Sequence, residues 1–139
     1  MNFEDMLAKA MANNKPRKKP SEEEHQLQCA CVKAFRYQFP KYALSLFAVP
    51  NGGQRNAVVA AKLKAEGVLA GVSDLLFLEA CGPFHGLAIE LKTPKGVQSK
   101  AQKEWQEYIE SRGWKYVVIR SVDEFMMEVK GYLKLSIEH

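Results

Sequence analysis

Two apolar segments of this 139-residue chain carry ionisable residues where buried β-strands normally have none. Residues 71–78 contain a predicted strand that opens near Asp74, and residues 86–92 form one that ends in Glu90 and Lys92. Side chains alternate between the two faces of a strand, so Glu90 and Lys92 are expected on the same side. Charges entering an apolar run need strong compensation. The chain must therefore fold so that these groups find partners at one end of a sheet.

The rest of the pattern predicts an α/β fold, a mixed β-sheet flanked by helices in the order α-β-α-β-β-α-β-α. Capping residues mark the helix starts, with an Asn or a Ser before each apolar periodic run. The expected helices cover residues 21–38, 56–66 and 99–112 and begin again at residue 121. The expected strands cover residues 43–49, 71–78, 86–92 and 114–119. A short turn at residues 81–84 predicts that the two central strands form an antiparallel hairpin.

The domain organisation is simple, because 139 residues suit one domain with a proper core. Residues 1–20 are predicted to be a flexible basic arm, since residues 13–20 hold two prolines and four cations. This arm is either a plain leader or a segment that contacts phosphates. Residues 21–139 are expected to form the single folded domain.

Composition narrows the class of protein further. The net charge of +4 is compatible with a polyanionic partner without requiring one. No apolar run approaches the roughly 20 residues that span a bilayer, and no secretory signal pattern opens the chain, so we expect no membrane contact and a cytoplasmic location. The three cysteines lack Cys/His ligand spacing, which disfavours a structural zinc site.

The charged residues at the predicted strand ends have two explanations. Asp74 can bond to local backbone amides, and Glu90 with Lys92 can form an ordinary salt bridge. The apolar stretch before Glu90 favours a different arrangement, in which a bound Mg²⁺ compensates the two carboxylates. A lysine beside such a site can neutralise a phosphate or orient a water molecule. These residue types suit metal-assisted phosphodiester hydrolysis.

Several motifs of the chain occur together in a known family. Gly-x-x-Asp at residues 71–74 and Ile-Glu-Leu-Lys at residues 89–92 resemble the PD-(D/E)XK nuclease superfamily. The motif order is similar to that of VRR-NUC domains, above all the stand-alone bacteriophage and bacterial members. The resemblance covers about residues 21–133. Its other motifs are Glu-His-Gln-Leu-Gln at residues 24–28, Pro-Asn-Gly-Gly-Gln-Arg at 50–55 and Ser-x-x-Gln at 99–102. Ser73 departs from the family, which has proline before the first acid.

The resemblance implies a restriction-endonuclease-like fold and a DNA endonuclease that depends on Mg²⁺ or Mn²⁺, with no organic cofactor. Stand-alone members are similar to Holliday-junction resolvases, which implies a homodimer acting on branched DNA. If the chain is encoded by a phage, its location is the host cytoplasm. Two alternatives stay open: a DNA-binding module that keeps the fold without turnover, and a monomer that cuts flap or nicked DNA.

The resemblance also implies roles for particular residues. Asp74 and Glu90 look like metal ligands together with the Leu91 carbonyl, and Lys92 looks like the catalytic lysine. Glu24 resembles a helical glutamate that completes the acidic cluster. Its neighbours Glu22 and Glu23 compete for that role, and a capping box with Ser21 explains Glu24 equally well.

Further predicted site residues have structural explanations of their own. Gln102 is expected beside the active site, although a capping box with Ser99 accounts for it completely. A loop of glycine amides with an arginine fork can meet a DNA phosphate, and a lysine after the catalytic strand can extend that surface. The predicted DNA-binding residues are Asn51, Gly52, Gly53, Arg55 and Lys95.

Overall fold

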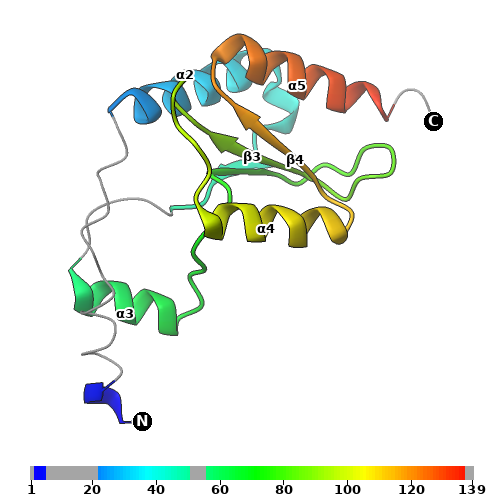
Figure 1. Cartoon of the computed structure of the whole chain (residues 1–139). Coiled ribbons are helices and arrows are strands. Elements are labelled where there is room, and N and C mark those ends of the chain that lie inside the picture. The colour runs from blue at the N-terminus through cyan, green and yellow to red at the C-terminus, as the bar shows by residue number, and fades with distance from the viewer. Residues whose placement is uncertain (1, 6–21, 51–55, 137–139) are drawn as a thin grey trace.

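The computed structural model describes residues 2–5, 22–50 and 56–136, and it confirms the predicted mixed α/β class. The helices follow in chain order as α2 (Glu22–Gln38), α3 (Ala57–Ala65), α4 (Lys100–Ser111) and α5 (Val122–Lys134). The strands are β1 (Leu46–Ala48), β2 (Leu75–Phe77), β3 (Leu87–Leu91) and β4 (Lys115–Ile119). A short 3₁₀ helix, η1 (Pro40–Tyr42), follows α2 and was not predicted from the sequence. Figure 1 shows these elements around one sheet.

The sheet has the strand order β1-β2-β3-β4. The strands β1, β2 and β3 pair antiparallel, which confirms the predicted central hairpin, while β4 runs parallel to β3. The register places Leu75 opposite Ile89. Extending this register by one residue sets Asp74 opposite Glu90. Side chains at opposite positions of neighbouring strands are close enough to touch.

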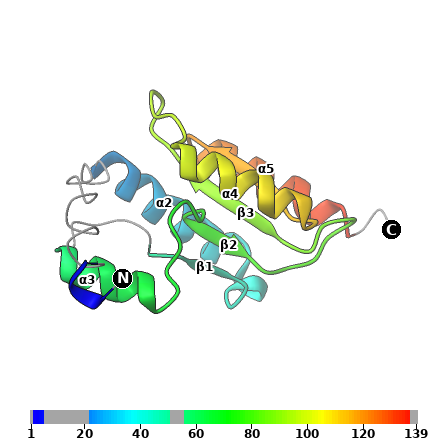
Figure 2. The ribbon, with the colours of Figure 1, turned by 60° about the horizontal axis from the view of Figure 1, so that its bottom comes forward.

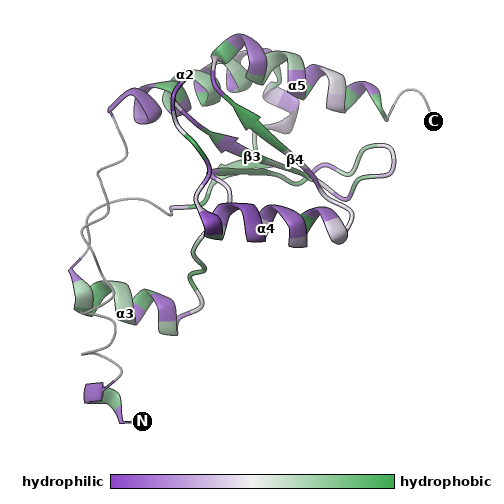
Figure 3. Ribbon diagram, viewed as in Figure 1, coloured by the Kyte–Doolittle hydropathy of each residue, from purple (hydrophilic) through white to green (hydrophobic). Residues whose placement is uncertain are grey.

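Helices cover both faces of the sheet. Figures 1 and 2 show α2 and α5 on one face and α4 on the other, with α3 set apart from the sheet. The outer helix α4 is largely hydrophilic, whereas the strands between the layers are largely hydrophobic (Figure 3). The core lies between the sheet and the pair α2–α5. Its largest fully buried side chains include Phe35, Phe77, Phe125, Tyr132, Leu87 and Ile89. Since Leu87 and Ile89 face this core, the alternate residue Glu90 points toward α4.

The predicted helix caps are confirmed wherever the structure describes them. The Asn56 side chain accepts a bond from the Val59 amide at 2.8 Å and begins α3. Ser99 and Gln102 form the full capping box of α4. At the start of α5 the Ser121 hydroxyl accepts from the Glu124 amide, but the Glu124 carboxylate accepts from Arg120 instead of Ser121. The predicted cap of α2, Ser21, lies outside the described residues.

Two strands are shorter than the sequence predicted. Residues 43–45 form a turn after η1, so β1 begins only at Leu46. Residues 71–74 lead into β2 without joining its ladder, although Val49 still donates to the Asp74 carbonyl at 2.8 Å. Because β1 has three residues, β2 pairs with it over three residue pairs. Apolar composition alone therefore overestimated both strands.

The ends of the chain are only partly described. Residues 3–5 form one helical turn, and residues 6–20 lie outside the described part, so the flexible basic arm stays a prediction. Within the described residues no helix has both the length and the apolar character needed to cross a membrane. Of the three free cysteines, Cys31 and Cys81 are buried and Cys29 is exposed.

Gly71 forms a turn three residues before Asp74, and its replacement is expected to destabilise the fold. Its φ is +92°, and an added Cβ would collide with the backbone carbonyl of Ala101 in α4. Gly71→Ala is therefore expected to lower the free energy of unfolding by about 2–4 kcal/mol in urea denaturation. The matched control is Gly67→Ala, where φ is +105° and nothing lies within 4 Å of the added Cβ. Equal losses for the two variants would show that contact with α4 is unimportant.

Candidate active site

Asp74 and Glu90 meet at the ends of two adjacent strands. The Leu91 amide donates a hydrogen bond to Asp74 Oδ2 at 2.7 Å, which fixes the Asp74 carboxylate against β3. The two acid side chains also hydrogen-bond each other. Since two carboxylates can share a hydrogen bond only through a proton, this contact favours a protonated Glu90 and raises its pKa. The fold thus brings together the two acids that the sequence singled out.

Glu90 is buried, with 2% of its surface exposed, yet both of its oxygens have donors. The Gln102 amide of α4 donates to Oε1 at 3.0 Å. The Tyr116 hydroxyl of β4 donates to Oε2 at 3.4 Å. The carboxylate is therefore held from two neighbouring elements, and its plane is fixed by the surrounding fold.

Burial raises the pKa of Glu90 to about 9. Loss of hydration is the largest cause, followed by the negative charge of Asp74 and the hydrogen bond that the two acids share. Lys92 and the Tyr116 hydroxyl act in the opposite direction and lower this pKa. The site accordingly carries more acidic groups than the nearby lysine compensates, which is the electrostatic condition for binding a cation.

Lys92 and Glu24 complete the charged cluster. Lys92 follows the last residue of β3, and its charge acts on both Glu90 and Glu24. The pKa of Glu24 is raised chiefly by burial, with Lys92 lowering it and Asp74 raising it. Glu22 and Glu23 are exposed, whereas Glu24 is partly buried. Of the three candidate helical acids, Glu24 is therefore the one directed toward the strand ends.

The donor set suits a hard divalent cation. It consists of carboxylate oxygens together with the Leu91 carbonyl. The Lys92 amide donates to the Ile119 carbonyl of β4, so the Leu91 carbonyl of the same peptide group points the opposite way, toward β2 and Asp74. Mg²⁺ and Mn²⁺ prefer oxygen ligands of this kind. Across residues 2–5, 22–50 and 56–136, no three His, Cys, Asp or Glu side chains are arranged closely enough to hold a metal ion. The proton-sharing pair is the part of the site that is already assembled.

Gln102 performs two structural tasks with one amide group. Its oxygen accepts from the Ser99 amide at 2.8 Å, which closes the capping box, while its nitrogen donates to Glu90. The capping explanation is therefore confirmed, and the same amide group also contacts Glu90. The start of α4 is tied directly to the acidic pair.

The predicted DNA-binding residues are less well described. Asn51, Gly52, Gly53 and Arg55 lie outside the described residues, so their role stays a prediction. Lys95 is exposed on the loop that follows β3. This loop is fastened by the Arg120 guanidinium, whose Nη1 donates to the carbonyls of Thr93 at 2.7 Å and Gly96 at 2.8 Å.

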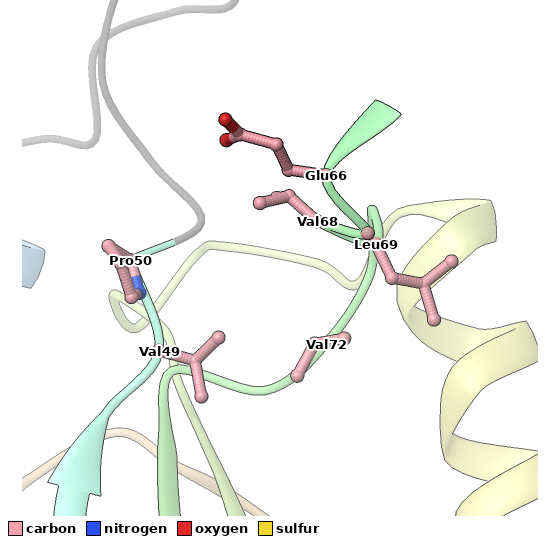
Figure 4. Close-up of a pocket in the computed structure, with 7 residues that line it drawn as sticks. Val49, Pro50, Glu66, Val68, Leu69 and Val72 are labelled. Carbon is pink, nitrogen blue, oxygen red and sulfur yellow. The ribbon is translucent and has the colours of Figure 1, made fainter. Parts of the chain in front are cut away.

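An apolar depression of about 350 Å³ lies beside the strand ends (Figure 4). It is lined by Val49, Pro50, Glu66, Gly67, Val68, Leu69 and Val72. The backbone of Val49 connects it to Asp74 through a hydrogen bond. None of these described lining residues carries a positive charge.

The sequence did not reveal Tyr116, Gln98 or Arg120. Tyr116 lies in a strand, where a tyrosine is ordinary, and Gln98 precedes a helix cap in an irregular segment. Arg120 follows β4 and resembles any solvated arginine in the sequence. Each acts on a residue distant in the chain, and no local pattern reports such contacts.

Comparisons with known proteins agree with this fold. Residues 17–123 match the model of the VRR-NUC domain. A solved structure described as a VRR_NUC domain protein shares 30% sequence identity, with a TM-score of 0.72 over 82% of this chain and 90% of that one. No curated protein matches the chain. The family model spans most of the chain, and the solved structure shares its fold. The chain therefore belongs to the VRR-NUC domain family of nucleases.

Proposed function

We propose that this chain is a DNA endonuclease that depends on a divalent cation and hydrolyses phosphodiester bonds. The observation that carries the proposal is the Asp74–Glu90 pair, which shares a hydrogen bond at the strand ends within reach of the Lys92 charge. A buried acidic pair is costly for a purely structural site. A cation that replaces the shared proton in the active protein would offset this cost.

The chain supplies ligands, a positive charge and orientation. Asp74 and Glu90, with the Leu91 carbonyl and Glu24, would hold the cation. Bound there, Mg²⁺ or Mn²⁺ would polarise the scissile phosphate and lower the pKa of a bound water. The Lys92 ammonium offsets negative charge on the phosphate and can orient the attacking water. Gln102 keeps the Glu90 carboxylate in place from α4.

The substrate is proposed to be branched DNA, and the working form a homodimer. The support is the resemblance to stand-alone VRR-NUC members, together with the need for two active sites when both strands of a junction are cut symmetrically. The net charge of +4 and the exposed Lys95 suit a polyanionic substrate. The residues 51–55 would contribute phosphate contacts.

A cleavage assay on several DNA structures tests the proposal. Plasmid, flap, cruciform and Holliday-junction DNA are incubated with the protein and Mg²⁺ or Mn²⁺, and sedimentation measures the oligomeric state. We expect cleavage of at least one branched substrate, abolished by EDTA. Lys92→Ala is expected to slow cleavage by about 10²–10³-fold, because it removes a charge that stabilises the transition state.

The control variant is Lys103→Ala, which removes the same charge from an exposed position on α4. It should cleave at nearly the wild-type rate. Salt-sensitive DNA binding without product on any substrate would contradict the proposal and identify a non-catalytic binding module. Cleavage of flap DNA by a monomer would retain the nuclease and refute the branched-DNA homodimer.

A further inference from the structure

The site contains a chain of hydrogen bonds that runs in one direction toward Glu90. The Gln98 amide donates to the Tyr116 hydroxyl oxygen at 3.2 Å, and Tyr116 in turn donates to Glu90 Oε2 at 3.4 Å. Because Gln98 already supplies a hydrogen to the tyrosine oxygen, the tyrosine hydrogen is free to point at the carboxylate. The order of donors therefore ends on Glu90 Oε2, which accepts from the tyrosine.

Tyr116 is held firmly enough to act as a fixed support. It is 8% exposed and lies in β4, next to β3 in the parallel ladder. Its ring packs against Trp105 of α4 with 6.1 Å between ring centroids. An ordered aromatic ring with one polar end can hold a carboxylate at the cost of little side-chain freedom.

Gln98 is fixed from two sides as well. Its amide nitrogen also donates to Gln106 Oε1 of α4 at 3.0 Å. The loop that carries it is fastened by Arg120 through the carbonyls of Thr93 and Gly96. The segment between β3 and α4 is thereby joined, through Tyr116, to Glu90 in β3.

We propose that Tyr116 and Gln98 are positioning residues that hold the Glu90 carboxylate in the orientation in which it binds the divalent cation. This inference rests on the proposed function. Gln102 fixes Oε1 and Tyr116 fixes Oε2, so loss of the tyrosine hydroxyl leaves Glu90 with one support in place of two. Groups that orient a metal ligand from outside the coordination shell typically change metal affinity by 10–100-fold.

The test measures the Mn²⁺ requirement of the full chain by two methods. One is the Mn²⁺ concentration that half-maximally raises the thermal unfolding midpoint without DNA, and the other is the Mn²⁺ midpoint of cleavage. For Tyr116→Phe we expect both concentrations to rise about tenfold, with the cleavage rate at saturating Mn²⁺ within about threefold of wild type. A purely structural role would lower the rate or the stability without moving the Mn²⁺ requirement.

Two further variants keep the test decisive. Tyr108→Phe, an exposed tyrosine of α4, should leave both Mn²⁺ midpoints unchanged. Gln98→Leu should raise them in the wild-type background but add nothing to Tyr116→Phe, since Gln98 acts through the tyrosine. This coupling can be measured even if Tyr116→Phe is less stable.

The possible failures are distinguishable. If wild type responds to Mn²⁺ and Asp74→Asn does not, while Tyr116→Phe matches wild type, the positioning role is overturned and the proposed function stands. If Gln98→Leu and Tyr116→Phe act additively, the directional chain is overturned. Absence of any Mn²⁺ response in wild type would overturn both this inference and the metal-dependent nuclease.

Discussion

Asp74→Asn is expected to reduce metal-dependent DNA cleavage by on the order of 10²–10⁴-fold, the largest effect of any single change in this chain. Asparagine keeps an oxygen that can accept the Leu91 amide but loses the negative charge that would hold the cation. The loss should appear as a much lower cleavage rate at moderate Mg²⁺. Raising the metal concentration should restore it only in part.

Folding and substrate binding of this variant are expected to survive. Asparagine removes a charge but keeps an oxygen that can accept the hydrogen of a protonated Glu90, so the thermal unfolding midpoint without metal should stay close to that of wild type. DNA binding in EDTA should be unchanged or tighter, because one negative charge is removed from beside the phosphate. Glu107→Gln, an exposed acid of α4, is the matched control and should cleave like wild type. Near-wild-type cleavage by Asp74→Asn would exclude Asp74 as a metal ligand.

The second large effect concerns the pH dependence of stability. In the folded, metal-free chain the pKa of Glu90 is raised from 4.5 to about 9, chiefly by burial. Between these values the folded state keeps a proton that the unfolded state has lost. The bound proton therefore stabilises the folded state. Its contribution to the free energy of unfolding is complete below pH 4.5 and is lost as the pH rises toward 9, by at most about 1.4 kcal/mol per pH unit. The raised pKa of Glu24 adds to this trend in the same direction.

Glu90→Gln should remove most of this slope. The amide has the shape of a protonated glutamic acid but cannot ionise, so the metal-free variant should be more stable than wild type at pH 8. Urea denaturation at pH 5, 6.5 and 8 measures the effect, with Glu107→Gln as the surface control. Saturating Mn²⁺ should flatten the wild-type profile, because the cation takes the place of the proton. If the free energy of unfolding changed with pH in the same way for wild type and Glu90→Gln, the pKa of Glu90 would not be raised by folding.

Much of the fold followed from local signals. Asn56 and Ser99 were correctly predicted as helix caps, because a cap is decided by a side chain and an amide three residues away. Periodic apolar runs predicted helices at the positions of α2 and α5, which bury Phe35, Phe125 and Val129. The strand lengths were not predicted, since the extent of β1 and β2 depends on the partner with which each pairs.

The candidate site divides in the same way. Asp74, Glu90 and Lys92 were identifiable because a charge within an apolar strand is conspicuous in any sequence. Gln102 and Glu24 were ambiguous, since a helix cap explains both residues equally well. Tyr116 and Gln98 carried no signal. Their contacts with Glu90, or with each other, join residues that are 18–26 positions apart.

Local and periodic patterns in the sequence specify the element types, their order, the helix starts and the presence of two acids and a lysine. These depend on contacts within a few residues or on the period of apolar side chains. Long-range packing brings Asp74 into contact with Glu90 and directs Glu24 toward them. It also lets one amide of Gln102 both cap α4 and support Glu90. The register of β2 on β3 and the placement of α4 produce these contacts. They form between distant segments only when the sheet assembles, because hydrophobic burial brings those segments together.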